Sequence, residues 1–260
     1  MIINAWAKQM TKELTFIQLK AGITLGIAGY QVPKEGLYVP LVTDFLAERI
    51  KQYSEDQVIT VPSILQGILF LLGADPEFKY RIQYEELCRH TSDQLYSVAL
   101  EAARNLENNR EFSKAALIMR GYNVFHPKHD QAAIMLAGYY IRVTDALGSA
   151  SKELRESLML ESLQLLENCY SAHQNNTILL YYLGRVYQWQ KYFLKAEITW
   201  KLALQKISDE DQSQLIRDRL HQIEPYARYE EGYQLILKGK NRKGLELLIP
   251  LQQRLPNWWN

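Results

Sequence analysis

Small and large residues recur at helical spacing in residues 177–204, and this spacing constrains the fold more than any other feature of the chain. Gly184 and Ala196 are small, whereas Tyr187 and Trp200 are large and aromatic. A helical hairpin of this kind cannot bury its apolar face alone and must pack on further elements. The stretch therefore predicts repeated helical hairpins.

A 34-residue frame that begins at Thr177 fits other segments of the chain as well. Frames from Tyr96 and Pro225 keep the small and large positions, and a frame from Asp130 keeps them after an insertion around residues 148–155. The predicted repeats are residues 96–129, 130–176, 177–210 and 225–258, with residues 211–224 as an additional helix or a helical extension. This pattern resembles the tetratricopeptide repeat family. The resemblance implies an α-solenoid with a right-handed superhelix. It also implies that Gly184 and Ala196 let paired helices approach, and that Tyr187 and Trp200 are packing residues that fill the space between them.

The resemblance also implies a concave groove, which in this family is lined by the first helix of each repeat. The residues at the matching positions are Arg104, Arg142, Tyr181, Arg185, Trp189, Tyr229 and Tyr233. Aromatic rings and guanidinium groups suit a protein or peptide segment that is acidic and carries an apolar anchor. A second interpretation stays open, in which these side chains pack on neighbouring repeats or on the N-terminal helices.

Residues 1–90 are predicted to form an N-terminal helical region, separate from the repeat array of residues 91–260. Apolar residues recur at helical spacing in residues 6–19 and 41–50, although no repeat register is evident there. Thr60 and Pro62 are placed to begin a helix that Gly73 ends. Residues 64–72 are the most apolar segment, yet they are too short to cross a bilayer. Strand signals are almost absent, so the predicted fold class is all-α.

Charge and cysteine content limit the partners and the compartment. The 30 basic and 29 acidic residues nearly cancel, so no global field attracts nucleic acid or a membrane surface. The two cysteines do not form a disulfide framework, and no secretory leader pattern opens the chain. We therefore expect a cytoplasmic protein without a nucleic-acid or membrane partner.

The residues that could carry chemistry do not combine into a site. His126 and His129 offer two imidazoles where a metal site needs three or four ligands, so a loop between repeats is the favoured interpretation. Cys88 and His90 lie two positions apart and hence on different faces of a helix. The glycine-rich residues 239–244 lack the signature of a phosphate loop and are predicted to form a helix turn. No metal, cofactor or enzymatic activity is expected.

The sequence therefore favours a non-enzymatic scaffold for protein–protein interaction. The alternative is a regulatory sensor, in which a peptide or small ligand bound by the repeats changes how residues 1–90 sit. An open aromatic groove would favour the scaffold, whereas a groove filled by the N-terminal helices would favour the sensor. The oligomeric state and the identity of the partner are left open.

Overall fold

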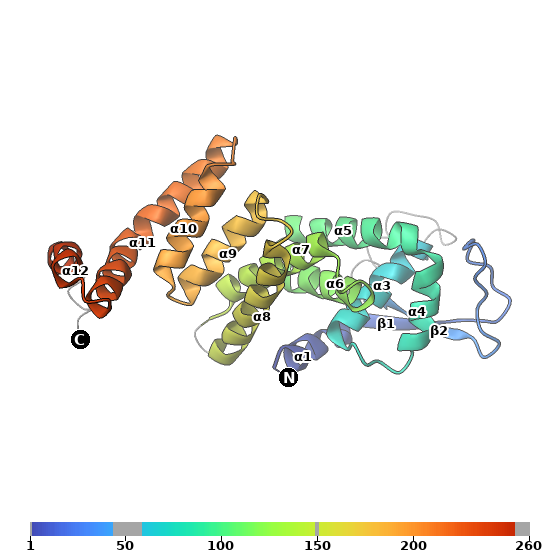
Figure 1. The fold of residues 1–260 in the computed structure, drawn as a ribbon. Coiled ribbons are helices and arrows are strands. Elements are labelled where there is room, and N and C mark those ends of the chain that lie inside the picture. Colours follow the sequence, from blue (N-terminus) through green and yellow to red (C-terminus); the bar gives the residue numbers. More distant parts are fainter. Residues whose placement is uncertain (1, 44–58, 149–150, 253–260) are drawn as a thin grey trace. The chain divides into compact units, whose positions relative to one another are not determined.

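The computed structural model describes residues 2–43, 59–148 and 151–252, and it is mostly helical (Figure 1). Its internal contacts divide the chain into two compact units, Met1–Leu160 and Glu161–Asn260. Helix α8, Lys152–Tyr170, contains the point of division. The helical content agrees with the predicted class, with the exception of a small sheet near the N-terminus.

That sheet corrects the prediction for the first residues. Helix α1 spans only Ile2–Lys8, a 3₁₀ turn follows at Gln9–Glu13, and strand β1 spans Leu14–Leu19. Strand β1 pairs antiparallel with β2, Leu37–Val42, so that Leu14 lies opposite Val42 and Leu19 opposite Leu37. The helix predicted over residues 6–19 is therefore wrong beyond its first turn.

The helix predicted over residues 41–50 also begins in this sheet, because Leu41 and Val42 belong to β2. Residues 44–50 lie outside the described part of the chain. Cross-strand pairing explains both errors. Aromatic and β-branched residues such as Phe16 and Ile17 are favoured in strands, and their pairing with β2 outweighs a weak helical periodicity.

Helix α3, Val61–Ala74, confirms the predicted helix and forms the core of the first unit. Thr60 and Ser63 form a capping box at its start, and Pro62 occupies the first turn. Its side chains from Ile64 to Leu72 are almost all buried. Gly67 lets the helix approach β2 so closely that an added Cβ would lie 1.9 Å from the Pro40 carbonyl oxygen.

Helices α4 to α7 and the first part of α8 complete the first unit. Helix α4 spans Arg81–His90, α5 Ser92–Asn108, α6 Phe112–Phe125 and α7 Asp130–Ala146. Helices α5 and α6 confirm the hairpin predicted for the first repeat, with Ala103 and Ala115 fully buried. Helix α6 also crosses α3 closely, since a Cβ on Gly121 would lie 1.8 Å from the Leu69 carbonyl oxygen.

The second unit contains the hairpin that the sequence defines most clearly. Helix α9 spans Thr177–Trp189 and α10 spans Phe193–Leu204. Trp200 is fully buried and its indole Nε1 donates a hydrogen bond to the Tyr181 carbonyl oxygen at 3.1 Å. A Cβ on Gly184 would lie 2.1 Å from the same nitrogen. The packing role predicted for Trp200 is therefore confirmed.

The chain continues in one long helix and a short hairpin. Helix α11 spans Glu210–Leu237 with Pro225 inside it, which confirms residues 211–224 as a helical extension. Gly239, with a φ of 73°, makes the predicted turn into α12, Asn241–Leu248, and a 3₁₀ turn follows at Ile249–Leu251. Gly232 and Gly244 bring α11 and α12 together, because a Cβ on Gly244 would lie 2.7 Å from the Gly232 carbonyl oxygen.

Candidate binding site

One face of α9 carries three of the predicted groove residues. Tyr181, Arg185 and Trp189 follow one another at intervals of one turn and are all half-buried. The helix begins where it does because the Asn176 side chain accepts hydrogen bonds from the backbone N–H groups of Ile178 and Leu179, both at 3.0 Å. The predicted side chains of α9 thus share one face of the helix.

The predicted pair on α11 also lies together. The rings of Tyr229 and Tyr233 stack with centroids 6.3 Å apart and planes 6° apart. Tyr233 is half exposed. The second unit therefore displays an aromatic pair on α11 in addition to the face of α9.

A pocket of about 220 Å³ lies between α9 and the start of α11. Its lining residues are Thr177, Ile178, Tyr181, Tyr182, Ile207, Gln212, Leu215 and Ile216. Ile178 is 50% and Leu215 is 45% exposed, so apolar carbon is open to solvent at this site. Every described lining residue is uncharged. The pocket is therefore suited to an apolar side chain, with hydroxyl and amide groups that can fix its orientation.

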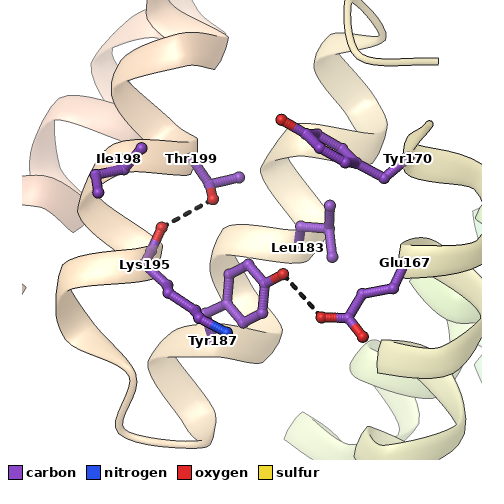
Figure 2. Close-up of a pocket in the computed structure, with 7 residues that line it drawn as sticks. All are labelled: Glu167, Tyr170, Leu183, Tyr187, Lys195, Ile198 and Thr199. Carbon is purple, nitrogen blue, oxygen red and sulfur yellow. Dashed lines mark hydrogen bonds between the residues drawn. The ribbon is translucent and has the colours of Figure 1, made fainter. Parts of the chain in front are cut away.

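A second pocket, of about 380 Å³, is formed by α8, α9 and α10 (Figure 2). The residues that line it are Glu167, Tyr170, Leu183, Tyr187, Lys195, Ile198 and Thr199. The Tyr187 hydroxyl donates to Glu167 Oε1 at 3.0 Å, and the Lys195 ammonium lies 5.4 Å from the centre of the Tyr187 ring. Figure 2 shows Glu167 and Lys195 on different sides of this ring.

Burial raises the pKa of Tyr187 above its ordinary value, and the hydrogen bond to Glu167 adds to this effect. The phenol therefore stays protonated at neutral pH and acts as a donor, which suits binding rather than proton abstraction. The sequence analysis assigned Tyr187 to packing and missed this pocket. Sequence spacing could not have linked Tyr187 to Glu167, because the two residues belong to different helices.

Arg104 and Arg142 belong to the first unit, whereas the other predicted groove residues belong to the second. Arg104 is exposed on α5. Arg142 on α7 forms an ion pair with Glu107 on α5, and the Tyr139 hydroxyl donates to the same carboxylate at 3.1 Å. The Arg142 guanidinium also lies 5.3 Å from the centre of the Phe112 ring. These contacts tie α5, α6 and α7 together.

The two histidines lie in the connection between α6 and α7, as predicted. His129 Nδ1 accepts a hydrogen bond from the Ala132 backbone N–H at 3.2 Å and so caps α7. His126 lies against the ring of Tyr122, with centroids 4.8 Å apart. In the described residues no group of three or more His, Cys, Asp or Glu side chains could hold a metal ion. His126 and His129 therefore act as packing and capping residues in the connection between α6 and α7.

Cys88 on α4 is buried, and burial raises the pKa of its thiol to about 12. A thiol with such a pKa is protonated at neutral pH and is a poor nucleophile. The second cysteine, Cys169, is also buried. The Cys88 thiol therefore provides no reactive centre that would compete with the pockets as the functional site.

Comparison with known proteins gives no match to this chain among protein-family models, curated proteins or solved structures. Within the described residues, every helix is too short or too polar to cross a membrane. The site is therefore interpreted from its own geometry.

Proposed function

We propose that this protein is a non-enzymatic scaffold whose second unit binds a peptide or protein segment through α9 and α11. The observation that carries the proposal is the apolar pocket between these two helices, which includes the predicted groove residue Tyr181. In this proposal the helical hairpins act as tetratricopeptide-like repeats, and the α9 face with its pocket is part of a ligand groove.

The chemistry of the face defines the proposed ligand. Ile178 and Leu215 expose apolar surface at the pocket, so the segment inserts one apolar side chain there. Tyr181 and Trp189 supply flat contact area at a low cost in rotamer entropy, which is typical of residues that dominate binding energy. Arg185 lies between them on the same face and favours an acidic residue next to the apolar anchor.

Matched variants of two exposed isoleucines test the proposal. Phage that display random decapeptides are selected on the full chain, and the affinity of the selected peptides is measured by fluorescence anisotropy. Ile178→Glu places a carboxylate in the α9–α11 pocket and is expected to weaken binding about tenfold or more. Ile198→Glu makes the same change at the Tyr187 pocket and is expected to leave binding unchanged.

The opposite pattern would reject the proposed site. If Ile198→Glu abolishes binding and Ile178→Glu does not, the peptides occupy the Tyr187 pocket. If neither variant affects any selected peptide, the second unit does not use either pocket for recognition. Thermal unfolding of both variants serves as the control for folding.

A further inference from the structure

Strand β1 has one unused edge. It pairs with β2 on one side, and in the described part of the chain no strand pairs with its other edge. The Leu14 N–H is already used, because it donates to the Thr11 carbonyl oxygen of the preceding 3₁₀ turn. Edge strands in monomeric proteins are normally protected by a proline, a bulge or a charged side chain. The segment Leu14–Leu19 contains neither a proline nor a charged residue. As far as the described residues extend, this edge is therefore open to a further strand at Phe16 and Gln18.

The direction of the backbone groups follows from Pro40 on β2. Proline has no N–H, and the Pro40 carbonyl points at α3, because a Cβ on Gly67 would lie 1.9 Å from its oxygen. Phe16 lies opposite Pro40 and so cannot exchange hydrogen bonds with it. Since antiparallel pairs alternate, the N–H and C=O groups of Phe16 and Gln18 point to the open edge.

An exposed aromatic patch, formed by Phe16, Tyr38, Phe78 and Tyr80, adjoins this edge. Phe16 stacks on Phe78 with centroids 5.8 Å apart, and Tyr38 stacks on Tyr80 at 6.0 Å. Phe16 is 40% and Tyr38 is 42% exposed. Beneath the patch, the buried Tyr84 donates from its hydroxyl to the Tyr38 carbonyl oxygen at 2.7 Å and holds β2 in place. A side chain of a bound strand beside Phe16 would meet these rings.

The charges near the edge are predominantly basic. Lys12 and Lys20 flank β1, and the Lys79 ammonium lies 4.6 Å from the centre of the Tyr80 ring. None of these three lysines has an ion pair in the described residues. The neighbouring acidic residues with ion pairs are Glu13 with Lys114, and Glu77 and Glu85 with Arg81. Lys34 and Glu35, which are adjacent in the β1–β2 loop, offset one another.

We propose that the open edge of β1 accepts an extended, acidic segment of another protein as a third strand of the sheet. Backbone groups of Phe16 and Gln18 hydrogen-bond the segment, the aromatic patch contacts its apolar side chains, and the unpaired lysines attract its carboxylates. A second copy of this chain fits less well, because it would bring the same lysines close together.

Hydrogen exchange on the full chain tests the proposal. The probe is the set of synthetic peptides obtained by selecting phage-displayed random decapeptides on this protein, and exchange of single amides is followed by NMR. One class of selected peptides is expected to be acidic with alternating apolar residues, and to slow exchange at Phe16 and Gln18 about tenfold or more. Thr15, Ile17 and Leu19, which face β2, serve as internal controls and stay protected throughout.

Backbone N-methylation separates strand pairing from contact with the aromatic patch. A peptide methylated at the nitrogens that face β1 is expected to bind about tenfold more weakly, whereas methylation at the alternate nitrogens leaves affinity nearly unchanged. Lys79→Glu is expected to weaken binding severalfold, and Lys34→Glu, a lysine in the loop, is expected to have little effect. Ile178→Glu leaves this binding unchanged, so the result is independent of the α9–α11 pocket.

Three results would overturn the proposal. The first is that no selected peptide slows exchange at Phe16 and Gln18. The second is that both methylation patterns weaken binding equally, which would show that side chains alone hold the peptide. The third is protection of these two amides that rises with protein concentration without peptide, which would identify a second copy as the occupant.

Discussion

Replacing Gly184 by alanine tests the contact on which the α9–α10 hairpin depends. A Cβ at this position would lie 2.1 Å from Trp200 Nε1 and 2.4 Å from Cδ1, far inside van der Waals contact. The indole is fully buried and its Nε1 donates to the Tyr181 carbonyl oxygen, so it cannot move without loss of packing and of this hydrogen bond. We expect Gly184→Ala to destabilise the second unit.

The expected change in the free energy of unfolding combines two destabilising contributions and one stabilising contribution. Overpacking a buried contact costs about 1 to 3 kcal/mol, and a weakened hydrogen bond costs about 0.5 to 1.5 kcal/mol. Alanine is favoured over glycine inside a helix by about 1 kcal/mol, which offsets part of this cost. The net expectation is a loss of about 2 kcal/mol in the free energy of unfolding. For a unit of this size the melting temperature should fall by roughly 10 °C.

Urea unfolding followed by circular dichroism measures this change. Gly148→Ala is the control, because a Cβ there meets nothing within 4 Å and its backbone needs no left-handed conformation. In a Trp200→Leu background the clash is relieved, and alanine at position 184 should then be neutral or slightly stabilising. A Gly184→Ala protein as stable as the parent, or more stable, would refute the assigned contact between α9 and α10.

Three further predictions concern the first unit. Glu107→Gln should lower its stability by about 1 kcal/mol or less in urea unfolding, because the ion pair with Arg142 is partly exposed to solvent; a larger loss would contradict this. Burial, with the charge of His129 adding to it, lowers the pKa of His126, so the unfolded state binds its proton more tightly. The stability contributed by neutral His126 should therefore be lost as pH falls below about 6.5, and the urea midpoint of His126→Asn should depend less on pH in this range. Deleting residues 1–90 should expose the face of α6 that packs on α3 and cause aggregation in size-exclusion chromatography; an equally stable monomer would contradict this.

Local sequence patterns predicted most of the helices and the contacts of the clearest hairpin. Gly184 and Trp200 were assigned to opposite helices from the repeat pattern that the sequence resembles, and Thr60 and Pro62 marked the start of α3. These features depend on residues close in sequence, where capping and periodicity are informative. The sheet was missed because β1 is stabilised by pairing with β2, across a loop whose sequence does not set the register.

The candidate site was predictable only in part. The shared face of Tyr181, Arg185 and Trp189 follows from helical spacing, whereas the pocket beside it requires Leu215 and Ile216 from a different helix. Helical spacing says nothing about which loop or helix closes a pocket. The open edge of β1 was invisible for the same reason, since the strand itself was predicted as helix.

Pro225 shows how tertiary contacts override a local signal at the site. The repeat frame places this proline at the start of a new hairpin, yet it lies inside α11, where it cannot donate to the carbonyl four residues earlier. The helix continues because residues after the proline are held on α10. Tyr226 stacks on Phe193 with centroids 4.9 Å apart, and the Glu230 carboxylate accepts from the Leu194 backbone N–H at 2.9 Å.

These contacts also cap the first turn of α10, where the Tyr192 side chain provides no hydrogen bond. The residues before Pro225 and those after it therefore form one helix against α10. Leu215 and Ile216, which the repeat frame leaves in a spacer, become walls of the pocket beside Tyr181. The proposed binding site thus depends on a helix that the repeat pattern divides, and the continuity of that helix depends on contacts with α10.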